Sequence, residues 1–353
     1  MRVLMTADAV GGVWTYALEL SGALAVHNVE VTLCVMGPAP HAEQSAELTA
    51  SPVRRAYVTE YALEWMDDPW EDVERAGQWL LEIAKDVKPD VVHLNGYVHA
   101  VLPWDAPLVV VGHSDVLSWH EAVRGRPAGP EWRRYRERIA AGLAAADLLA
   151  APTQAMLDAL VRLYEPGCPR LVVPNGSGRE FPPLPKSHVV LGAGRLWDDA
   201  KNIETLVRVA PRVEWPVVVC GDGAVGNGVT ALGRLGREQL DRVLASAAIF
   251  AAPARYEPFG LAALEAGRAG CALVLGDIPS LREVWGSTAL YVPPDDDDEL
   301  ERTLHLLITR PDLRAEYAVR ARRRASRFTT ERMAGGYASA YRRVLRSIGV
   351  GVA

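Results

Sequence analysis

The sequence predicts an α/β protein made of two doubly wound Rossmann-like domains that face a cleft, followed by C-terminal helices. Three observations support this prediction. The chain has 353 residues, whereas a single hydrophobic core usually stops growing at about 250–300 residues. Short apolar, strand-like runs alternate with helix-like stretches, as in parallel sheets covered by helices. The proline-rich segment 181–185 interrupts this alternation, and it is suited to a linker because proline continues neither a helix nor a central strand.

The first domain is expected over residues 1–180. It opens with an apolar strand, a Gly11-Gly12 break and a helix with small residues between its leucines. The same order then recurs, with β-branched runs as strands and amphipathic stretches as helices. Strands are expected at 2–6, 29–36, 91–94, 108–111, 148–151 and 170–173, and helices at 13–26, 70–87, 130–146 and 154–164.

After the linker the alternation restarts and predicts a second domain over residues 181–330. Strands are expected at 189–193, 217–220, 229–232, 249–252, 272–275 and 290–292, helices at 202–209, 237–247 and 261–269, and a further apolar segment at 281–285. From Asp296 to about Ile348 the chain reads as helices. A terminal helix within 331–353 is expected to pack back on the first domain. Strands of such sheets direct their carboxyl ends toward a cleft, where ligands bind.

Composition and charge exclude several classes of protein. With 49% hydrophobic and 23% charged residues, the chain is not of the disordered class. Its formal charge of −6 lacks the basic excess that nucleic-acid binding requires. The charge is uneven, with 15 basic against 24 acidic residues in 1–180 and 23 against 20 in 181–353. The acidic first half disfavours docking on an anionic membrane, so weak peripheral contact is the most that we expect.

The cysteines and the apolar runs predict a cytoplasmic protein. Cys34, Cys168, Cys220 and Cys271 lie far apart, without CxxC or zinc-like spacing, and are expected to be free thiols in a reducing compartment. The first residues resemble neither a signal peptide nor a membrane span. No later apolar run reaches the roughly 18 residues that a transmembrane helix needs. The oligomeric state stays open.

The most informative stretch is RYEPFGLAALEAG at residues 255–267, which follows an apolar strand. Pro258 suits a helix entry, and Gly260 lets a ligand approach backbone N–H groups that have no helical partner. A helix N-terminus attracts an anion such as a diphosphate. Glu257 lies just before this helix, where it can meet a sugar, and Glu265 lies about two turns inside, where it can accept hydrogen bonds from a ribose diol. Alternatively, the two are an N-terminal charge and a solvated helix residue.

A second stretch, GAGRLWDDAKN at residues 192–202, occupies the equivalent place earlier in the same domain. A strand ends in glycines there, and Arg195 and Lys201 flank the loop that enters the next helix. Two cations beside a helix N-terminus form a clamp for a diphosphate that requires no metal ion. Either residue alone would be read as an ordinary surface charge.

Together these stretches resemble the signature of glycosyltransferase family 4, in the order GRLWDDAKN, GDG, LGR and RYEPFGLAALEA. The resemblance covers nearly the whole chain. It implies the GT-B fold and an enzyme that moves a sugar from a nucleoside-diphosphate sugar, UDP- or GDP-linked, to a hydroxyl acceptor. It also implies retention of the anomeric configuration, without metal or cofactor. The acceptor, which would be a glycan, a lipid-linked or a small molecule, is not specified.

The resemblance implies roles for single residues of the second domain. Arg195 and Lys201 would hold the diphosphate. Glu265 would bind the ribose, and Glu257 the hydroxyls of the donor sugar. The remaining contacts would come from the backbone, near Arg234 and Leu235 for the base and at Phe259, Gly260 and Leu261 for the phosphates.

The first domain gives weaker signals. Gly11-Gly12 opens the first helix, where the family's glycine loop approaches donor phosphate and acceptor, although a double glycine is usually just a turn. His113 follows the strand 108–111 and aligns with a family position that often carries a histidine near the reacting sugar; a structural histidine is the equally weighted alternative. The resemblance thus implies a catalytic set of His113, Glu257, Arg195 and Lys201, with no metal ligands.

Two patterns are discounted. GDGAVG at residues 221–226 matches the dinucleotide fingerprint, but β-branched residues follow it and no helix opens there. The acidic run 295–298 contains a DxD pattern, yet it lies at the start of a late helix, where carboxylates cap the helix and complement its dipole.

Two other functions remain as alternatives. A nucleotide-sugar 2-epimerase of the same fold needs the same diphosphate pocket but no acceptor. A non-catalytic nucleotide-sugar binding protein would bind without turnover. Acceptor contacts are expected from the first domain, where the run 60–72 and the loop 119–131 are distinctive; the glycines and prolines of that loop suit a mobile cover.

Overall fold

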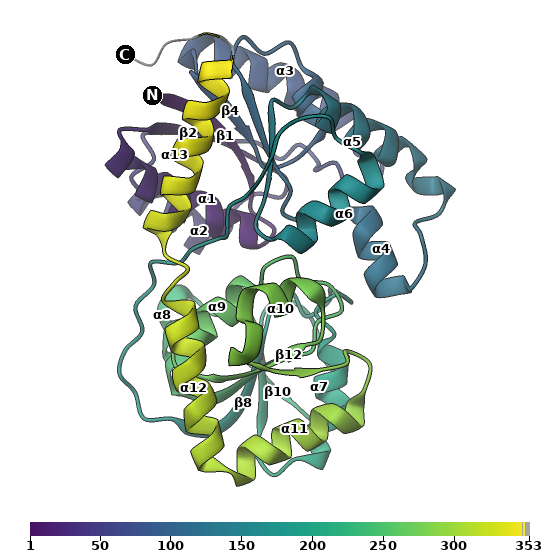
Figure 1. Ribbon diagram of the computed structural model, residues 1–353, viewed down its shortest axis with the longest axis vertical. Helices are drawn as coiled ribbons and strands as arrows, with labels where there is room; N and C mark the ends of the chain where they lie inside the picture. The colour runs from purple at the N-terminus through teal and green to yellow at the C-terminus, as the bar shows by residue number, and fades with distance from the viewer. Residues whose placement is uncertain (348, 350–353) are drawn as a thin grey trace. The chain divides into compact units, whose positions relative to one another are not determined.

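The computed structural model describes residues 1–347 and 349 (Figure 1). Its contacts divide the chain into two units. Unit 1 contains Met1–Glu121, Arg126–Gly176 and the chain from Thr329 onward, and unit 2 contains Ala122–Gly125 and Ser177–Phe328. The chain thus changes unit near residues 176 and 328, a few residues from the divisions expected after 180 and 330. Of the expected terminal segment 331–353, residues 348 and 350–353 lie outside the described residues.

Unit 1 is built on a seven-stranded parallel sheet in the order β3-β2-β1-β4-β5-β6-β7. The strands are β1 (Arg2–Asp8), β2 (Glu30–Met36), β3 (Arg55–Val58), β4 (Val91–Leu94), β5 (Leu108–Val111), β6 (Leu148–Ala151) and β7 (Arg170–Val172). The helices met along this part of the chain are α1 (Gly12–Leu24), α2 (Ala42–Ala50), α3 (Trp70–Val87), α4 (Val116–Arg124), α5 (Arg133–Ala145) and α6 (Gln154–Tyr164).

The last helix, α13 (Thr330–Ser347), also belongs to unit 1, where it packs on α1 (Figure 1). Side chains of a strand alternate between the two faces of its sheet. Val3 and Met5 of β1 therefore join Leu20 of α1 and Tyr341 of α13 in one buried core, all of them fully or almost fully buried. Because α13 supplies much of this core, unit 1 depends on a segment that follows the whole of unit 2.

Unit 2 contains a six-stranded parallel sheet in the order β10-β9-β8-β11-β12-β13. The strands are β8 (Ser187–Ala193), β9 (Val217–Cys220), β10 (Thr230–Ala231), β11 (Ala247–Ala252), β12 (Ala272–Gly276) and β13 (Leu290–Val292). The helices are α7 (Ile203–Val209), α8 (Arg237–Ser246), α9 (Leu261–Arg268), α10 (Pro279–Trp285), α11 (Asp297–Thr309) and α12 (Pro311–Ala325).

Helices cover both faces of this second sheet. Side chains of α9, α10 and α12 form one core with the strands, and its largest member is the completely buried Trp285. Side chains of α7 and α11 form the other core, which contains Leu206 and Leu304. The predicted α/β class, with two doubly wound parallel sheets and C-terminal helices, is therefore confirmed.

Each sheet reverses its winding direction once. In unit 1 the reversal falls between the neighbouring strands β1 and β4, and in unit 2 it falls between β8 and β11. In open α/β sheets, ligands bind beyond the carboxyl ends of the strands at such a switch point. The two motifs of the second domain follow β8 and β11, so the topology places both of them at this position.

The structure adds the helices α2 and α4 and the strand β3, which the sequence pattern did not predict, and it shows that the apolar segment 281–285 belongs to the helix α10. Because α4 spans Val116–Arg124, the interpretation of 119–131 as one loop is wrong over its first half. The GDGAVG segment opens no helix. A Cβ atom at Gly221 would lie 1.7 Å from the Gly194 carbonyl oxygen, so close packing of two strand ends explains this glycine.

The remaining predictions concern cysteines and the membrane. All four cysteines are free thiols, and Cys34, Cys220 and Cys271 are buried, while Cys168 is partly buried. Among the helices of the described residues, none has the length and apolar character needed to cross a membrane.

Candidate active site

The two motifs of unit 2 meet beyond the ends of β8 and β11. Lys201 Nζ donates to Glu257 Oε2 at 2.5 Å, which joins residues 56 positions apart in the sequence. Both side chains are about four-fifths buried, with exposed fractions of 18% and 21%. This ion pair holds the ammonium group in place beside the first turn of the helix that follows Glu257.

Arg195 is held by a residue inside its own loop. Its Nη2 donates to Asp198 Oδ2 at 2.6 Å, and its guanidinium lies over the exposed Trp197 ring, 5.5 Å from the centroid. Asp198 also accepts from the Ala200 amide at 3.0 Å. Burial alone would raise the pKa of Asp198, but Arg195 and the Ala200 amide outweigh it and lower the pKa overall. Asp198 stays ionised, and it is a site residue that sequence reasoning missed.

The start of α9 offers backbone N–H groups. Gly260 precedes α9 in the left-handed region, with φ of 90°, and no acidic residue occupies the first turn. The Phe259 side chain is buried edge-on against Phe328, with ring centroids 5.6 Å apart, so only its backbone faces outward from the core. The amides of Leu261 and the next residues have no partner within the helix, which makes this end suited to an anion.

Glu265, one of the predicted donor ligands, is engaged by an arginine. Arg179 Nη1 lies 2.6 Å from Glu265 Oε1, and Arg179 Nη2 pairs with Asp241. The Arg179 side chain is only 7% exposed and that of Glu265 only 10%. The interpretation of Glu265 as a solvated helix residue is therefore wrong. Sequence reasoning missed Arg179, because a single arginine just before the linker belongs to no motif.

Arg234 and Leu235 lie between β10 and α8 in unit 2. Arg234 Nη2 donates to Asp222 Oδ2 at 3.0 Å, and both side chains are largely exposed. Leu235 packs against the core that contains α9 and α10. Arg234 is thus exposed to solvent, and Leu235 is half-buried.

In unit 1, the predicted residues lie beyond the ends of two strands, β1 and β5. Gly11 precedes α1 and Gly12 is its first residue, in the turn after β1. His113 follows β5, and its ring packs edge-on against Tyr16 with centroids 4.4 Å apart. His113 Nε2 lies 2.8 Å from Asn95 Oδ1, beyond the end of β4. Sequence reasoning missed Asn95, which lies at the switch point.

Unit 1 also contains two buried carboxylates, Glu64 and Asp115. Glu64 accepts hydrogen bonds from the amides of Tyr97 and Val98, and burial raises its pKa to about 7. Asp115 caps α4 by accepting from the Ser118 amide at 2.8 Å, and it also accepts from the hydroxyl of Tyr164. Asp115 is buried, and its carboxylate is engaged by hydrogen bonds within the fold.

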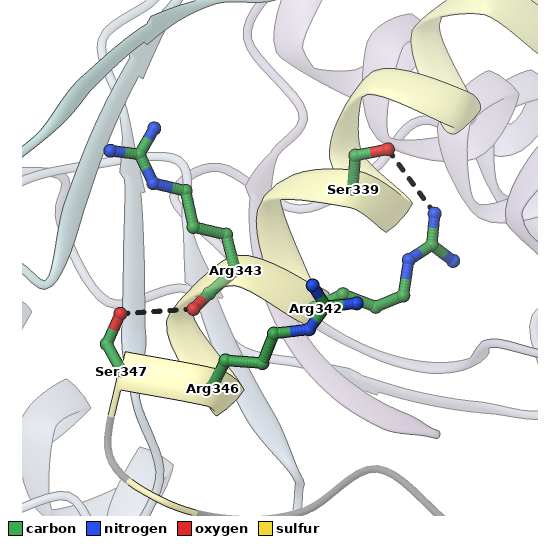
Figure 2. A pocket seen from close by; sticks show the side chains of 5 residues that line it. All are labelled: Ser339, Arg342, Arg343, Arg346 and Ser347. Atoms are coloured by element: carbon green, nitrogen blue, oxygen red, sulfur yellow. Dashed lines mark hydrogen bonds between the residues drawn. The ribbon is translucent and has the colours of Figure 1, made fainter.

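A hollow of about 500 Å³ lies elsewhere in unit 1, along the end of α13 (Figure 2). It is lined by Ser339, Arg342, Arg343, Arg346 and Ser347. Arg342 donates to the Ser339 hydroxyl at 3.3 Å, and Ser347 donates to the Arg343 carbonyl at 3.1 Å (Figure 2). None of the residues predicted for donor binding or catalysis lines this hollow.

Comparison with known families identifies the chain. The family model described as Glycosyltransferase Family 4 matches residues 10–177, and the model described as Glycosyl transferases group 1 matches residues 187–310. The chain belongs to glycosyltransferase family 4. It is a glycosyltransferase, and the predicted enzyme class is confirmed.

Curated relatives of this glycosyltransferase have related activities. The chain is 26% identical to a glycogen synthase of Mycobacterium tuberculosis, over 97% of this chain and 94% of that protein. It is 29% identical to a D-inositol 3-phosphate glycosyltransferase of Saccharomonospora viridis, over 69% of this chain and 66% of that protein. Their acceptors differ widely, so family membership leaves the acceptor of this chain open.

Solved structures confirm the GT-B fold of this glycosyltransferase. The sucrose-phosphate synthase of Thermosynechococcus elongatus superposes with a TM-score of 0.81 at 19% identity, covering 98% of this chain and all of that one. Anabaena HepE in complex with UDP-glucose superposes with a TM-score of 0.74 at 18% identity, covering 98% of this chain and 100% of that one.

Proposed function

We propose that this glycosyltransferase moves a sugar from a nucleoside-diphosphate sugar to a hydroxyl acceptor, with retention of configuration and without a metal ion or other cofactor. One observation carries the proposal. Two cationic side chains, Arg195 and Lys201, and the N-terminal end of α9 come together beyond β8 and β11, at the switch point of unit 2. A diphosphate needs both fixed charges and N–H donors, and this position supplies them.

The chemistry that these residues support is stabilisation of the leaving group. When the anomeric bond breaks, the sugar becomes oxocarbenium-like and negative charge collects on the departing diphosphate. Arg195 and Lys201 would exchange their present partners, Asp198 and Glu257, for phosphate oxygens. Glu257, released from the ammonium group, would accept hydrogen bonds from the sugar. The phosphate itself would take the proton of the acceptor hydroxyl on the same face, which retains the configuration.

The other residues that would contact the donor are proposed from their positions in the fold. Glu265, fixed by Arg179, is proposed to bind the ribose, and the backbone near Arg234 and Leu235 to face the base. Gly11 and Gly12 of unit 1 are proposed to approach the donor phosphate, and His113 to contact the sugar. A solved relative by fold, HepE, holds UDP-glucose, which supports UDP-sugars as the first donors to test, followed by GDP-sugars.

The decisive experiment measures sugar transfer with and without EDTA, using panels of UDP- and GDP-sugars and of glycan, inositol-phosphate and lipid acceptors. We expect transfer to persist in EDTA and the product to keep the anomeric configuration of the donor by NMR. Loss of transfer in EDTA would refute metal independence, and an inverted product would refute retention. An epimerised nucleotide sugar without acceptor product would indicate the epimerase instead.

Lys201→Ala tests the clamp itself. Removing one fixed donor to a developing charge commonly lowers kcat by about 10²–10³-fold. Arg343→Ala is the matched control, because it removes one exposed positive charge from a hollow that none of the predicted site residues lines (Figure 2). A Lys201→Ala enzyme as active as Arg343→Ala would contradict the clamp.

A further inference from the structure

A chain of hydrogen bonds joins the last helix of the protein to His113. Tyr341 Oη lies 2.7 Å from His93 Nδ1, and His93 Nε2 lies 3.1 Å from Asn95 Oδ1. The same amide oxygen lies 2.8 Å from His113 Nε2. All four residues belong to unit 1, and His93 and Tyr341 are completely buried. Residues 248 positions apart in the sequence are thus directly bonded.

The orientation of the Asn95 amide decides the direction of these bonds. Its Nδ2 donates to the Thr6 carbonyl at 2.6 Å, so Oδ1 is the atom that faces the two imidazoles. An amide oxygen accepts hydrogen bonds and cannot donate them. His93 and His113 must therefore both carry a proton on Nε2.

Burial keeps both imidazoles neutral. It lowers the pKa of His93 to about 4 and, together with the neighbouring His93, that of His113 to about 3. A neutral imidazole carries one N–H, so Nδ1 of each ring has a free lone pair. The His93 lone pair accepts a hydrogen bond from the Tyr341 hydroxyl. The His113 lone pair bonds to no residue in the described part of the chain.

We infer that Tyr341 is a positioning residue, which fixes His113 as the Nε2–H tautomer through His93 and Asn95 and so holds His113 Nδ1 as a hydrogen-bond acceptor for a sugar hydroxyl. The inference rests on the proposed function, in which His113 contacts the transferred sugar. Tyr16 supports the arrangement, because its ring packs edge-on against His113 and fixes the plane of the imidazole.

The hydroxyl of Tyr341 decides between the two tautomers of His93. In the Nδ1–H form of His93, Tyr16 Oη, which lies 3.3 Å from Nε2, would become the donor in place of Tyr341. The bare Nε2 would then repel Asn95 Oδ1 and displace the acceptor of His113. Without the Tyr341 hydroxyl, both forms of His93 become populated, and His113 loses its fixed tautomer.

The test combines NMR with kinetics on the full-length protein. Long-range ¹H–¹⁵N spectra report the tautomer of each imidazole, and His93→Gln and His113→Gln assign the two signals. In the wild type we expect both rings as the Nε2–H form. In Tyr341→Phe we expect mixed tautomers and a kcat lowered by about 2- to 12-fold, the equivalent of one hydrogen bond, with the donor KM unchanged.

Tyr337→Phe is the matched control. Tyr337 lies one turn earlier on α13 and packs its ring against the same His93, with centroids 5.1 Å apart. This variant should keep the wild-type tautomers, kcat and melting temperature.

Three results would overturn the inference: a wild-type His113 protonated on Nδ1, tautomers in Tyr341→Phe that match the control, or altered tautomers with an unchanged kcat. If no transfer is found at all, the proposed function fails, and the wild-type spectrum still decides the tautomer. If Tyr341→Phe does not fold, the wild-type spectrum still decides the tautomer of His113.

Discussion

Single ion pairs hold the cations of the candidate donor site before any ligand binds. Lys201 is paired with Glu257 and Arg195 with Asp198, each across a short salt bridge. The Arg195 side chain keeps 36% of its surface exposed and the Lys201 side chain 18%, whereas their partner Asp198 is almost fully buried. The pairs therefore order two long side chains in advance, which lowers the entropy lost when a diphosphate binds.

Arg179 is different, because it is buried between Glu265 and Asp241. Removing one partner of a buried ion pair typically destabilises a protein by about 3–5 kcal/mol, since a charge is left buried and unpaired. We expect Arg179→Ala to approach that loss in urea unfolding and to raise the donor KM by displacing Glu265.

Arg282→Ala is the control for that measurement. Arg282 pairs with Asp277 at the surface, where the two side chains are 54% and 36% exposed. Exposed ion pairs contribute little to stability, so this variant should stay close to the wild type. Equal losses for the two variants would contradict a special role of Arg179.

The sequence predicted the residues that share a motif and missed the residues that act through distant partners. Arg195, Lys201 and Glu257 stand in two recognisable stretches, and the structure joins Lys201 to Glu257. Arg179 and Asn95 have ordinary neighbours in the sequence. Their roles arise from partners brought together by the fold, such as Glu265 for Arg179, and no local spacing reveals such a pairing.

Among the secondary-structure elements, α9 links the fold most directly to the site. It begins directly after Gly260, in the segment that follows β11. The left-handed conformation of Gly260, with φ of 90°, turns the chain into the helix. A residue with a side chain adopts this conformation only at a cost of roughly 1–2 kcal/mol.

Gly260→Ala therefore tests the geometry of this helix end. The added Cβ would also lie 3.2 Å from a methyl group of Leu281. We expect a lower melting temperature and a higher donor KM, because the strain moves the amides that are proposed to face the phosphates. Gly335→Ala serves as the opposite control, since Gly335 lies within α13 with no atom near its Cβ position. At that position alanine should raise the free energy of unfolding by about 0.5–1 kcal/mol.

The elements that the sequence missed have weak patterns for identifiable reasons. β3 lies at the edge of its sheet, and its four residues are exposed or half-buried, so no apolar run marks it. The helix α2 has only Gln44 fully buried, and its N-cap is His41, which is not a usual capping residue. The strands at the centre of both sheets are buried on both faces, and their apolar runs made them predictable.

Across the molecule, the main segment of unit 2 begins at Ser177 and ends at Phe328, and these two places run side by side. The Ser177 amide donates to the Phe328 carbonyl at 3.2 Å, at the residues where the chain enters and leaves unit 2. The return of α13 completes the core of unit 1. Deleting α13 should therefore expose the core residues Val3, Met5 and Leu20 and unfold unit 1.

Buried neutral histidines also distinguish the two units. Unit 1 contains His93, His99 and His113, and burial lowers the pKa of each. His99 is 9% exposed and lies 3.0 Å from the Val73 carbonyl, and its pKa falls from 6.5 to about 4. Glu64 has the opposite effect on the pH dependence of stability. Its raised pKa makes the folded state bind a proton more readily than the unfolded chain does.

The sign of the His99 effect follows from proton binding. Between pH 6.5 and about pH 4 the unfolded chain binds a proton at His99 and the folded chain does not, so stability falls as the pH falls. At neutral pH His99 is unprotonated in both states, and its contribution to stability is constant.

In His99→Gln this loss of stability is absent, because glutamine does not titrate, while its amide can still donate to the Val73 carbonyl. We expect the wild type to lose on the order of 2 kcal/mol relative to the variant between about pH 7.5 and pH 5, measured by urea unfolding. A difference between the two proteins that stays constant over this range would show that His99 protonates as readily in the folded protein as in the unfolded chain.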